Sequence, residues 1–371
     1  MSSGGIVVVS AADERYIMPL TVMVRSLLEN LASGTPVDLY ILQDDVGAVS
    51  RCCAEDSWKP FPVRVRWISP DKSRLCGTSR GRRSAGPPAT YFRLLIGELL
   101  PPDVRKVIYL DADIVVTGDL SGLWDVEMNG NLALAVPDAY AKAFHLGRMS
   151  RVSFRENIRF DLQTPYFNAG ALVIDLEGWR RENVGARALR CVEDYGGDLT
   201  FRDQDALNCA LQGRWGALGP TWNFHELPDC LFLWDGHFYS REDLREAASN
   251  PKVIHFIARG KPWTRWCLDS RAEVFCDYLF RTRWPERAPQ ARSGIVDLVR
   301  ALLILPHSRL NRMVWRSDAS KGRASRFRSA LLLLVTHPWM LITYPLWQML
   351  VWLHFLLFVP IDRRSLILGR R

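Results

Sequence analysis

Short apolar segments alternate with amphipathic ones over the first 110 residues, and this alternation limits the folds open to the chain more than any other feature. Runs with the pattern of strands occupy residues 6–10, 37–42, 63–68 and 106–110. Residues 18–31 have the apolar spacing of a helix instead. Strands that alternate with helices form βαβ units around a parallel sheet. We therefore expect an α/β protein with a mixed, mostly parallel sheet.

Further elements are expected after residue 90. They are, in chain order, a helix over 91–100, strands over 132–136 and 171–174, a helix over 203–211 and a strand over 253–256. Residues 71–90 are rich in Ser, Gly, Arg and Pro, a composition that favours a loop. The sequence contains no internal repeat, and residues 284–293 are the best candidate for a linker.

The charge of the chain is unevenly distributed. The formal net charge is +8 at pH 7, but residues 292–371 carry thirteen Lys and Arg against three Asp. The preceding residues carry 35 basic against 37 acidic side chains and are nearly neutral. Nucleic-acid-binding enzymes concentrate positive charge on their binding face. A near-neutral body therefore argues against a nucleic acid as partner.

The end of the chain is predicted to associate with a membrane. Residues 329–361 contain no Asp, Glu, Lys or Arg, which is improbable for a soluble helix of that length. Pro338 and Pro345 interrupt the segment, and basic clusters flank it on both sides. We expect an interfacial or re-entrant segment with both flanks on the cytoplasmic face of a membrane. A single membrane span is the alternative.

Two carboxylates follow the apolar run at 106–110 and are the strongest chemical signal. Asp111 and Asp113 are separated by Ala112, at the end of a strand where open α/β sheets bind their ligands. Mg²⁺ or Mn²⁺ binds through one or two carboxylates and takes further oxygens from water and phosphate. In isolation, a helix-capping Asp beside a surface Asp is the more common explanation of such a pair.

Four later features place polar groups beside apolar segments. Asn168 and Gly170 precede the strand at 171–174, where a bidentate amide suits sugar hydroxyls and a glycine allows a close backbone approach, although an ordinary turn is the alternative. Asp203 and Gln204 open a helix, where acidic side chains also serve as caps. His255 ends an apolar strand as a third metal ligand or a structural histidine. Just beyond it, Gly260-Lys261 suits a pyrophosphate.

Taken together and in this order, these blocks resemble glycosyltransferase family 8, the retaining enzymes that use nucleotide sugars. The similarity extends from about residue 6 to residue 263. It implies a single Rossmann-like, nucleotide-sugar-binding domain of the GT-A type over residues 1–283. Residues 284–328 would form a basic linker with amphipathic helices, and residues 329–371 a hydrophobic, membrane-associated segment with a basic end. The membrane-associated tail is not shared with the family.

The resemblance also implies roles for individual residues. Asp111, Asp113 and His255 would bind Mn²⁺ (or Mg²⁺). The donor UDP-hexose would contact Ala12, Asp13, Tyr16, Arg93, Ala112, Gly170, Gly260 and Lys261, and its hexose would lie among Asp138, Asn168, Asp203 and Gln204. Ala258-Arg259 departs from the residues common in the family and leaves the contacts of that loop open.

The expected reaction moves galactose or glucose from a UDP-sugar to a hydroxyl of a glycan or a lipid-linked acceptor, as in cell-envelope polysaccharide or lipopolysaccharide synthesis. A metal and a lysine would stabilise the departing diphosphate. Because the amide of Gln204 is a poor nucleophile, attack from the face of the leaving group is favoured, with Asp203 as the reserve nucleophile. The alternatives are a haloacid-dehalogenase-like phosphohydrolase and an inactive, membrane-tethered sugar-binding protein.

Overall fold

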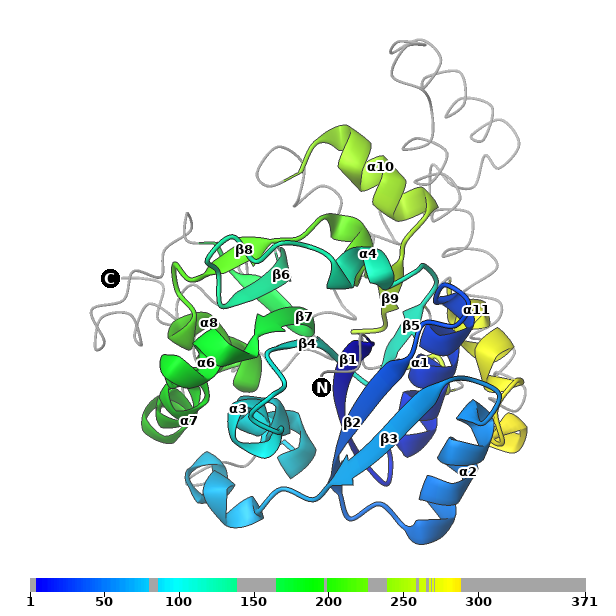
Figure 1. Ribbon diagram of the computed structural model, residues 1–371, viewed down its shortest axis with the longest axis horizontal. Helices are drawn as coiled ribbons and strands as arrows, with labels where there is room; N and C mark the ends of the chain where they lie inside the picture. The colour runs from blue at the N-terminus through cyan, green and yellow to red at the C-terminus, as the bar shows by residue number, and fades with distance from the viewer. Residues whose placement is uncertain are drawn as a thin grey trace, which may run out of the picture. The chain divides into compact units, whose positions relative to one another are not determined.

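A seven-stranded sheet with the order β3-β2-β1-β4-β7-β6-β8 dominates the computed structural model (Figure 1). Strands β1 to β4 pair in parallel, whereas β7 runs antiparallel to both β4 and β6. A second, two-stranded sheet joins β5 to β9. The strands are β1 Ile6–Asp13, β2 Val37–Asp44, β3 Val63–Ile68, β4 Lys106–Leu110, β5 Ile114–Val116, β6 Ala133–Pro137, β7 Phe167–Asp175, β8 Trp215–Ala217 and β9 Val253–His255. The predicted mixed, mostly parallel sheet is confirmed.

The structure describes part of the chain. The described residues are 5–79, 86–138, 165–196, 199–225, 239–257, 260–264, 267, 269 and 271–287. The chain divides into two compact units, of which the first comprises Met1–Phe224, Pro251–His255 and Asp277–Glu286. The second comprises His225–Asn250, Phe256–Cys276 and Arg287–Arg371.

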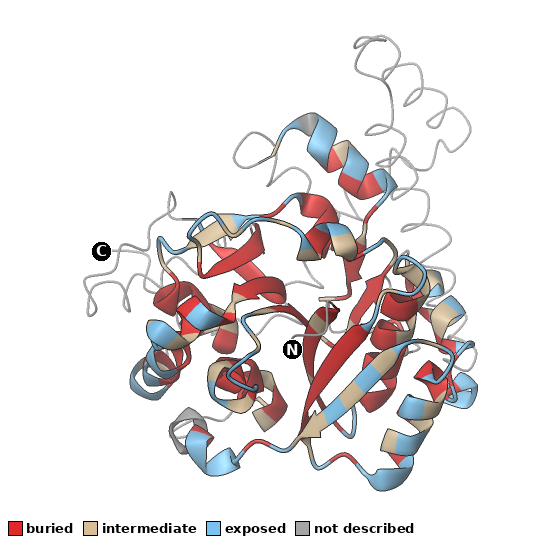
Figure 2. Ribbon diagram, in the orientation of Figure 1, coloured by how far each residue is buried: buried red, intermediate tan, exposed pale blue. Residues whose placement is uncertain are grey.

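Burial follows the position of each strand in the large sheet (Figure 2). Six of the eight residues of β1, and all of β2 except Asp44, are buried, because these inner strands are covered on both faces. Strand β3 lies at the edge and alternates intermediate with exposed residues. Its exposed Arg64 and Arg66 form ion pairs with Asp38 of the neighbouring strand. Such alternation is typical of a strand with one solvated face.

Helices cover both faces of the large sheet. The connection from β1 to β2 and the one from β3 to β4 lead in opposite directions along the sheet, so right-handed crossovers put their helices on opposite faces. One core cluster joins Val9 and Tyr109 to residues of η2, α7 and α8. The helical segments are α1 Ile17–Asn30, α2 Ala48–Trp58, η1 Lys72–Ser79, η2 Pro88–Leu95, α3 Ile96–Leu99, α4 Ser121–Trp124, α6 Leu176–Arg181, α7 Val184–Tyr195, α8 Asp203–Ala210, η3 Pro220–Asn223, α10 Arg241–Ser249, α11 Ala272–Leu279 and η4 Pro285–Arg287.

The structure corrects three expectations about local structure. The helix predicted over 91–100 is a 3₁₀ segment, η2, that continues into the short α3. The segment 71–90, expected to be a loop, contains η1 and the start of η2. Strand β7 begins at Phe167, so Asn168 and Gly170 lie inside the strand rather than in a turn before it.

The predicted membrane segment lies outside the described residues, as do residues 288–328. Among the residues that the structure does describe, no helix is both long and apolar enough to cross a membrane. The boundaries proposed at residues 283 and 328 stay predictions.

Candidate active site

The carboxyl end of β4 positions the pair of acidic residues. Directly after Leu110, the backbone N–H of Asp111 donates to the carbonyl oxygen of Gly170 on β7, at 2.8 Å. This bond extends the antiparallel pairing of β4 and β7 by one residue. The chain then turns at Ala112 and enters β5 at Ile114. Both carboxylates are thereby held at the edge of the large sheet, as the sequence predicted.

His255 reaches the same place from the second sheet. It is the last residue of β9 and pairs with Ile114 of β5, one residue beyond Asp113. Its Nε2 lies 3.3 Å from Oδ1 of Asp113 and 3.7 Å from Oδ2 of Asp111. One ligand atom from each of the three residues lies within 4.8 Å of the others. The structure thus brings the three predicted metal ligands together.

The surroundings of His255 fit a metal ligand. Its Nδ1 lies 2.9 Å from Oδ1 of Asn223, a pairing that leaves Nε2 toward the carboxylates. The ring packs against the backbone of Gly170, where a Cβ atom would come within 2.6 Å of Nδ1. Two carboxylates and an imidazole whose other nitrogen has a partner are a donor set suited to Mn²⁺ or Mg²⁺.

Arg93 is buried next to this cluster, and its guanidinium makes two hydrogen bonds and a further ion pair. One terminal nitrogen donates to the carbonyl oxygen of Ala169 at 2.8 Å, and the other donates to Oδ1 of Asp111 at 2.6 Å. Its Nε lies 2.9 Å from Oδ2 of Asp203. The guanidinium carbon lies 4.6 Å from the centre of the Tyr109 ring, whose hydroxyl donates to Asp111.

Burial shifts the titration of this group of side chains. It raises the pKa of Asp203 to about 6, although the positive charge of Arg93 acts in the opposite direction. Burial also opposes the charge of Arg93, but the carboxylates of Asp111 and Asp203 outweigh it and raise the pKa of the guanidinium. The pKa of Tyr109 is raised well above its ordinary value, mainly by burial. Arg93 therefore stays charged, and the pKa of Asp203 lies above that of an ordinary aspartate.

Of the four residues predicted around the hexose, Asp138, Asn168 and Gln204 form one hydrogen-bonded group. Asn168 Nδ2 donates to Oδ2 of Asp138 at 3.0 Å, and Gln204 Nε2 donates to the same oxygen at 3.2 Å. The backbone N–H of Ala169 donates to Oε1 of Gln204. Asp203 precedes Gln204 in the first turn of α8 and joins the group through Arg93.

The amide of Asn168 corrects one detail of the sequence interpretation. Its Oδ1 accepts from the backbone N–H of Gly170 and from Nδ2 of Asn223. A carbonyl oxygen has two lone pairs, so this atom is saturated. Asn168 therefore cannot offer a bidentate amide to a sugar, and one N–H remains for a ligand.

Three further residues belong to this network and were missed in the sequence. Asn223 links Asn168 to His255. The Tyr166 hydroxyl donates to Oδ1 of Asp205 at 2.6 Å, and Gln204 Nε2 donates to that hydroxyl at 3.3 Å. The adjacent acidic residues in Asp203-Gln204-Asp205 were a signal for Asp205, whereas nothing near Asn223 in the sequence marks it as polar and buried.

The predicted nucleoside-binding residues lie at the end of the neighbouring strand. Ala12 and Asp13 end β1, which runs parallel to β4, and Tyr16 immediately precedes α1. Asp13 accepts hydrogen bonds from the backbone N–H groups of Arg15 and Tyr16, both at 3.0 Å. Asp13 thus shapes the turn into α1.

The predicted diphosphate ligands Gly260 and Lys261 lie in the second compact unit. Lys261 Nζ donates there to the carbonyl oxygen of Phe256 at 2.5 Å. The neighbouring departure from the family pattern, 258–259, lies outside the described residues.

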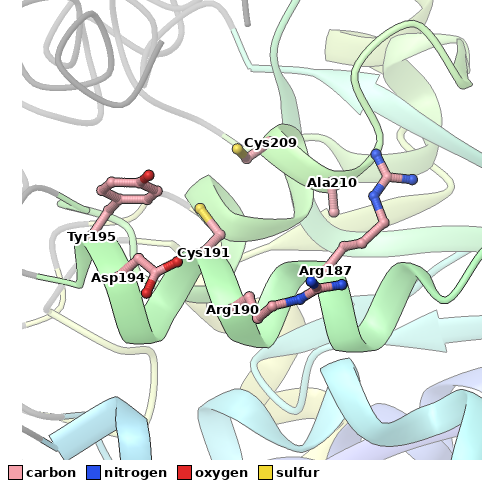
Figure 3. Close-up of a pocket in the computed structure, with 7 residues that line it drawn as sticks. All are labelled: Arg187, Arg190, Cys191, Asp194, Tyr195, Cys209 and Ala210. Carbon is pink, nitrogen blue, oxygen red and sulfur yellow. The ribbon is translucent and has the colours of Figure 1, made fainter. Parts of the chain in front are cut away.

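A separate pocket of about 600 Å³ opens between α7 and α8 (Figure 3). It shares no residue with the predicted site, although Cys209 and Ala210 come from the same helix as Asp203. The helix α8 begins at Asp203 and ends at Ala210, so about 10 Å of helix separates the two positions. The lining residues are Arg187, Arg190, Cys191, Asp194, Tyr195, Cys209 and Ala210.

Comparison with known proteins agrees with this geometry. General stress protein A of Bacillus subtilis is 27% identical over 280 residues, which cover 75% of this chain and 94% of that protein. The lipopolysaccharide 1,2-glucosyltransferase of Escherichia coli is 27% identical over 209 residues, 56% of this chain and 59% of that protein. The structure of galactosyltransferase LgtC in complex with donor and acceptor sugar analogues superposes with a TM-score of 0.62 at 26% identity, covering 75% of this chain and 96% of that one. Residues 7–267 match the family described as "Glycosyl transferase family 8". This chain belongs to glycosyl transferase family 8.

Proposed function

We propose that the protein is a metal-dependent retaining hexosyltransferase that moves galactose or glucose from a UDP-sugar to a hydroxyl group. The observation that carries the proposal is the convergence of Asp111, Asp113 and His255 beside a buried polar group at the carboxyl edge of the sheet. Among the similar proteins, one is named a glucosyltransferase and another a galactosyltransferase. Because the chain belongs to this family, the phosphohydrolase alternative is dropped.

Asp111, Asp113 and His255 would hold Mn²⁺ or Mg²⁺. A bound cation of this kind supplies positive charge to the oxygens of a departing diphosphate. Arg93 keeps Asp111 oriented, because its guanidinium is fixed between that carboxylate and Asp203. The prediction that Gly260 and Lys261 also bind the diphosphate is retained as part of this proposal.

The polar group next to the metal ligands would bind the hexose. Asp138 contributes a buried carboxylate, and Asn168 contributes one amide N–H. Gln204 is partly exposed, and its amide is held between the backbone of Ala169 and Asp138. Hydroxyl groups suit such a mixture of acceptors and donors.

The orientation of Gln204 favours attack from the face of the leaving group. Its oxygen accepts from a backbone N–H, and its nitrogen faces Asp138. An amide held in this way offers N–H donors and no nucleophile. The acceptor oxygen would bond to the anomeric carbon as the bond from that carbon to the phosphate oxygen breaks. The hydroxyl proton would pass to that phosphate oxygen, and Asp203, next to Arg93, remains the reserve nucleophile.

We further propose that the acceptor is a glycan or a lipid-linked glycan, reached at the cytoplasmic face of a membrane. The support is the sequence of the tail, where the charge-free residues 329–361 lie between basic clusters. Flotation with vesicles tests this part: the full chain should float with anionic vesicles more than with neutral ones. A chain that ends at residue 290 should float with neither kind of vesicle. Equal flotation of the two chains would contradict a membrane-binding tail.

A panel of nucleotide sugars tests the reaction itself. Hydrolysis of UDP-galactose or UDP-glucose with Mn²⁺ should exceed that of UDP-N-acetylhexosamines and GDP-sugars by at least tenfold. An Asp113→Asn variant is the matched control and should have no activity with any donor. A preference for N-acetylhexosamine or GDP donors would contradict the proposed donor class. Binding of UDP-hexose without hydrolysis or transfer would support the inactive sugar-binding alternative.

A further inference from the structure

We propose that Asn223 is a positioning residue that sets the tautomer of His255 through a relay of hydrogen bonds beginning at the backbone of Gly170. The relay, defined here as Gly170, Asn168, Asn223 and His255, extends from β7 through η3 to β9. This inference rests on the proposed function in one respect, namely that His255 is a metal ligand.

The first step fixes the amide of Asn168. The backbone N–H of Gly170 lies 2.9 Å from one end of this amide, and a backbone N–H can only donate. The atom that faces it is therefore the oxygen. The other end lies 3.0 Å from the carboxylate of Asp138, which accepts from the amide nitrogen. Two independent contacts thus give Asn168 the same orientation.

The second step fixes the amide of Asn223. The Asn168 oxygen can only accept, so the end of Asn223 that lies 2.8 Å away is the nitrogen. The oxygen of Asn223 then faces His255, with 2.9 Å between Oδ1 and Nδ1. The reverse orientation would bring two amide oxygens together at Asn168 and is disfavoured.

The third step fixes the proton on the imidazole. The amide oxygen of Asn223 accepts only, so Nδ1 of His255 carries a hydrogen. In the neutral ring, Nε2 then carries the lone pair, on the side of Asp111 and Asp113. A metal ligand requires this form of the ring. Without the relay, the two nearby carboxylates would favour a hydrogen on Nε2, which would block metal binding.

The side chains of the relay are buried, so they depend on one another for their hydrogen bonds. Asn223 is fully buried, and Asn168 and His255 are 6% and 5% exposed. Water therefore has little access to replace a missing partner, and each amide must satisfy its neighbours within the protein. The same Asn168 that would contact the hexose thus also controls the metal ligand.

Nitrogen NMR of the full-length protein, labelled with ¹⁵N-histidine and measured without metal at alkaline pH, reads the tautomer directly. The signal of His255, assigned by its loss in His255→Ala, should show a hydrogen on Nδ1 and a lone pair on Nε2. Asn223→Leu should change this signal, and its Mn²⁺ affinity, measured by electron paramagnetic resonance, should fall by about 10–100-fold. Asn223→Asp keeps an acceptor for Nδ1–H and should keep the tautomer, but it sets a carboxylate oxygen against Oδ1 of Asn168 and should therefore lose stability.

Asn208→Leu is the matched control. Asn208 is also a buried asparagine, but its amide bonds to the backbone of Phe167 and Gln204 and not to the relay. This variant should lose stability while it keeps the tautomer and the Mn²⁺ affinity of the unmodified protein.

A hydrogen on Nε2 in the unmodified protein would overturn the inference. So would an Asn223→Leu variant with an unchanged tautomer and unchanged Mn²⁺ affinity. The NMR measurement needs neither donor nor turnover. A protein with the expected tautomer but no transferase activity would therefore overturn the proposed function and leave the relay in place.

Discussion

The imidazole of His255 occupies the space that a side chain at Gly170 would need. A Cβ atom at position 170 would lie 2.6 Å from Nδ1, closer than real Cβ contacts allow. Gly170 also supplies the N–H that orients Asn168 and the carbonyl that receives the N–H of Asp111. The absence of a side chain at this position therefore lets β7 and the metal ligands meet.

Gly170→Ala should displace the imidazole and weaken Mn²⁺ binding by at least tenfold. Gly219→Ala is the matched control, because a Cβ there meets nothing within 4 Å and the backbone has φ −61°. Titration of Mn²⁺ monitored by electron paramagnetic resonance checks both variants. Equal affinity of the two alanine variants would show that His255 can move without loss of the metal.

Asp111→Asn and Asp113→Asn should both abolish Mn²⁺-dependent turnover but should differ in stability. Asp111 is one of two carboxylates that pair with the buried Arg93, so its loss should cost about 1–3 kcal/mol. Asp113 lies close to the carboxylate of Asp111, whose charge repels it when no metal is bound, so its replacement should leave the free energy of unfolding level or higher. Urea denaturation of the metal-free variants measures the difference. Turnover within a few-fold of the unmodified enzyme would rule out a ligand role.

Arg93→Met should destabilise the protein by about 3–5 kcal/mol, because it leaves the buried Asp203 and the half-buried Asp111 without their cation. Adding Asp203→Asn should recover part of that loss. The double variant should then be more stable than the sum of the two single changes by about 0.5–3 kcal/mol. Strict additivity of the three measured free energies would show that Arg93 and Asp203 are not coupled.

The raised pKa of Asp203, about 6 against an ordinary value of 3.8, predicts a pH dependence of stability. The folded state favours the protonated carboxyl of Asp203. The stability that this carboxyl contributes is fully present below about pH 4 and is lost as the pH rises through 6. Between pH 5 and pH 7, the unmodified protein should lose about 1 kcal/mol relative to Asp203→Asn. Asp194→Asn, at an exposed carboxylate, should follow the unmodified protein. A constant difference between Asp203→Asn and the unmodified protein across this range would contradict the shift.

The sequence predicted the strands that carry the metal ligands because their signal is local. Residues 106–110 are apolar and are followed at once by Asp111 and Asp113, and β4 has these bounds in the structure. The edge strand β3, with alternating arginines, was also placed correctly at Val63–Ile68. Apolar runs and alternating patterns of this kind can be identified in the sequence, whatever the strands pair with.

The contacts within the site could not be predicted, because they join residues far apart in the chain. Asn223 meets Asn168, 55 residues away, and Arg93 meets Asp203 across 110 residues. The saturation of the Asn168 oxygen and the burial of Arg93 follow only from those contacts. The helical segment η1 and the first residues of η2 were missed because Gly, Ser and Pro favour loops, whereas buried Leu75 and Ala89 anchor these residues to the core.

Isothermal titration of the full-length protein with UDP, with and without Mn²⁺, tests the central claim most directly. The metal site and the family together predict that UDP binds in the presence of Mn²⁺ and that its affinity falls at least tenfold when the metal is removed. Asp113→Asn should bind UDP no better with Mn²⁺ than the unmodified protein does without it. UDP binding that is equally tight without the metal, or no UDP binding in either condition, would contradict a metal-dependent UDP-sugar transferase.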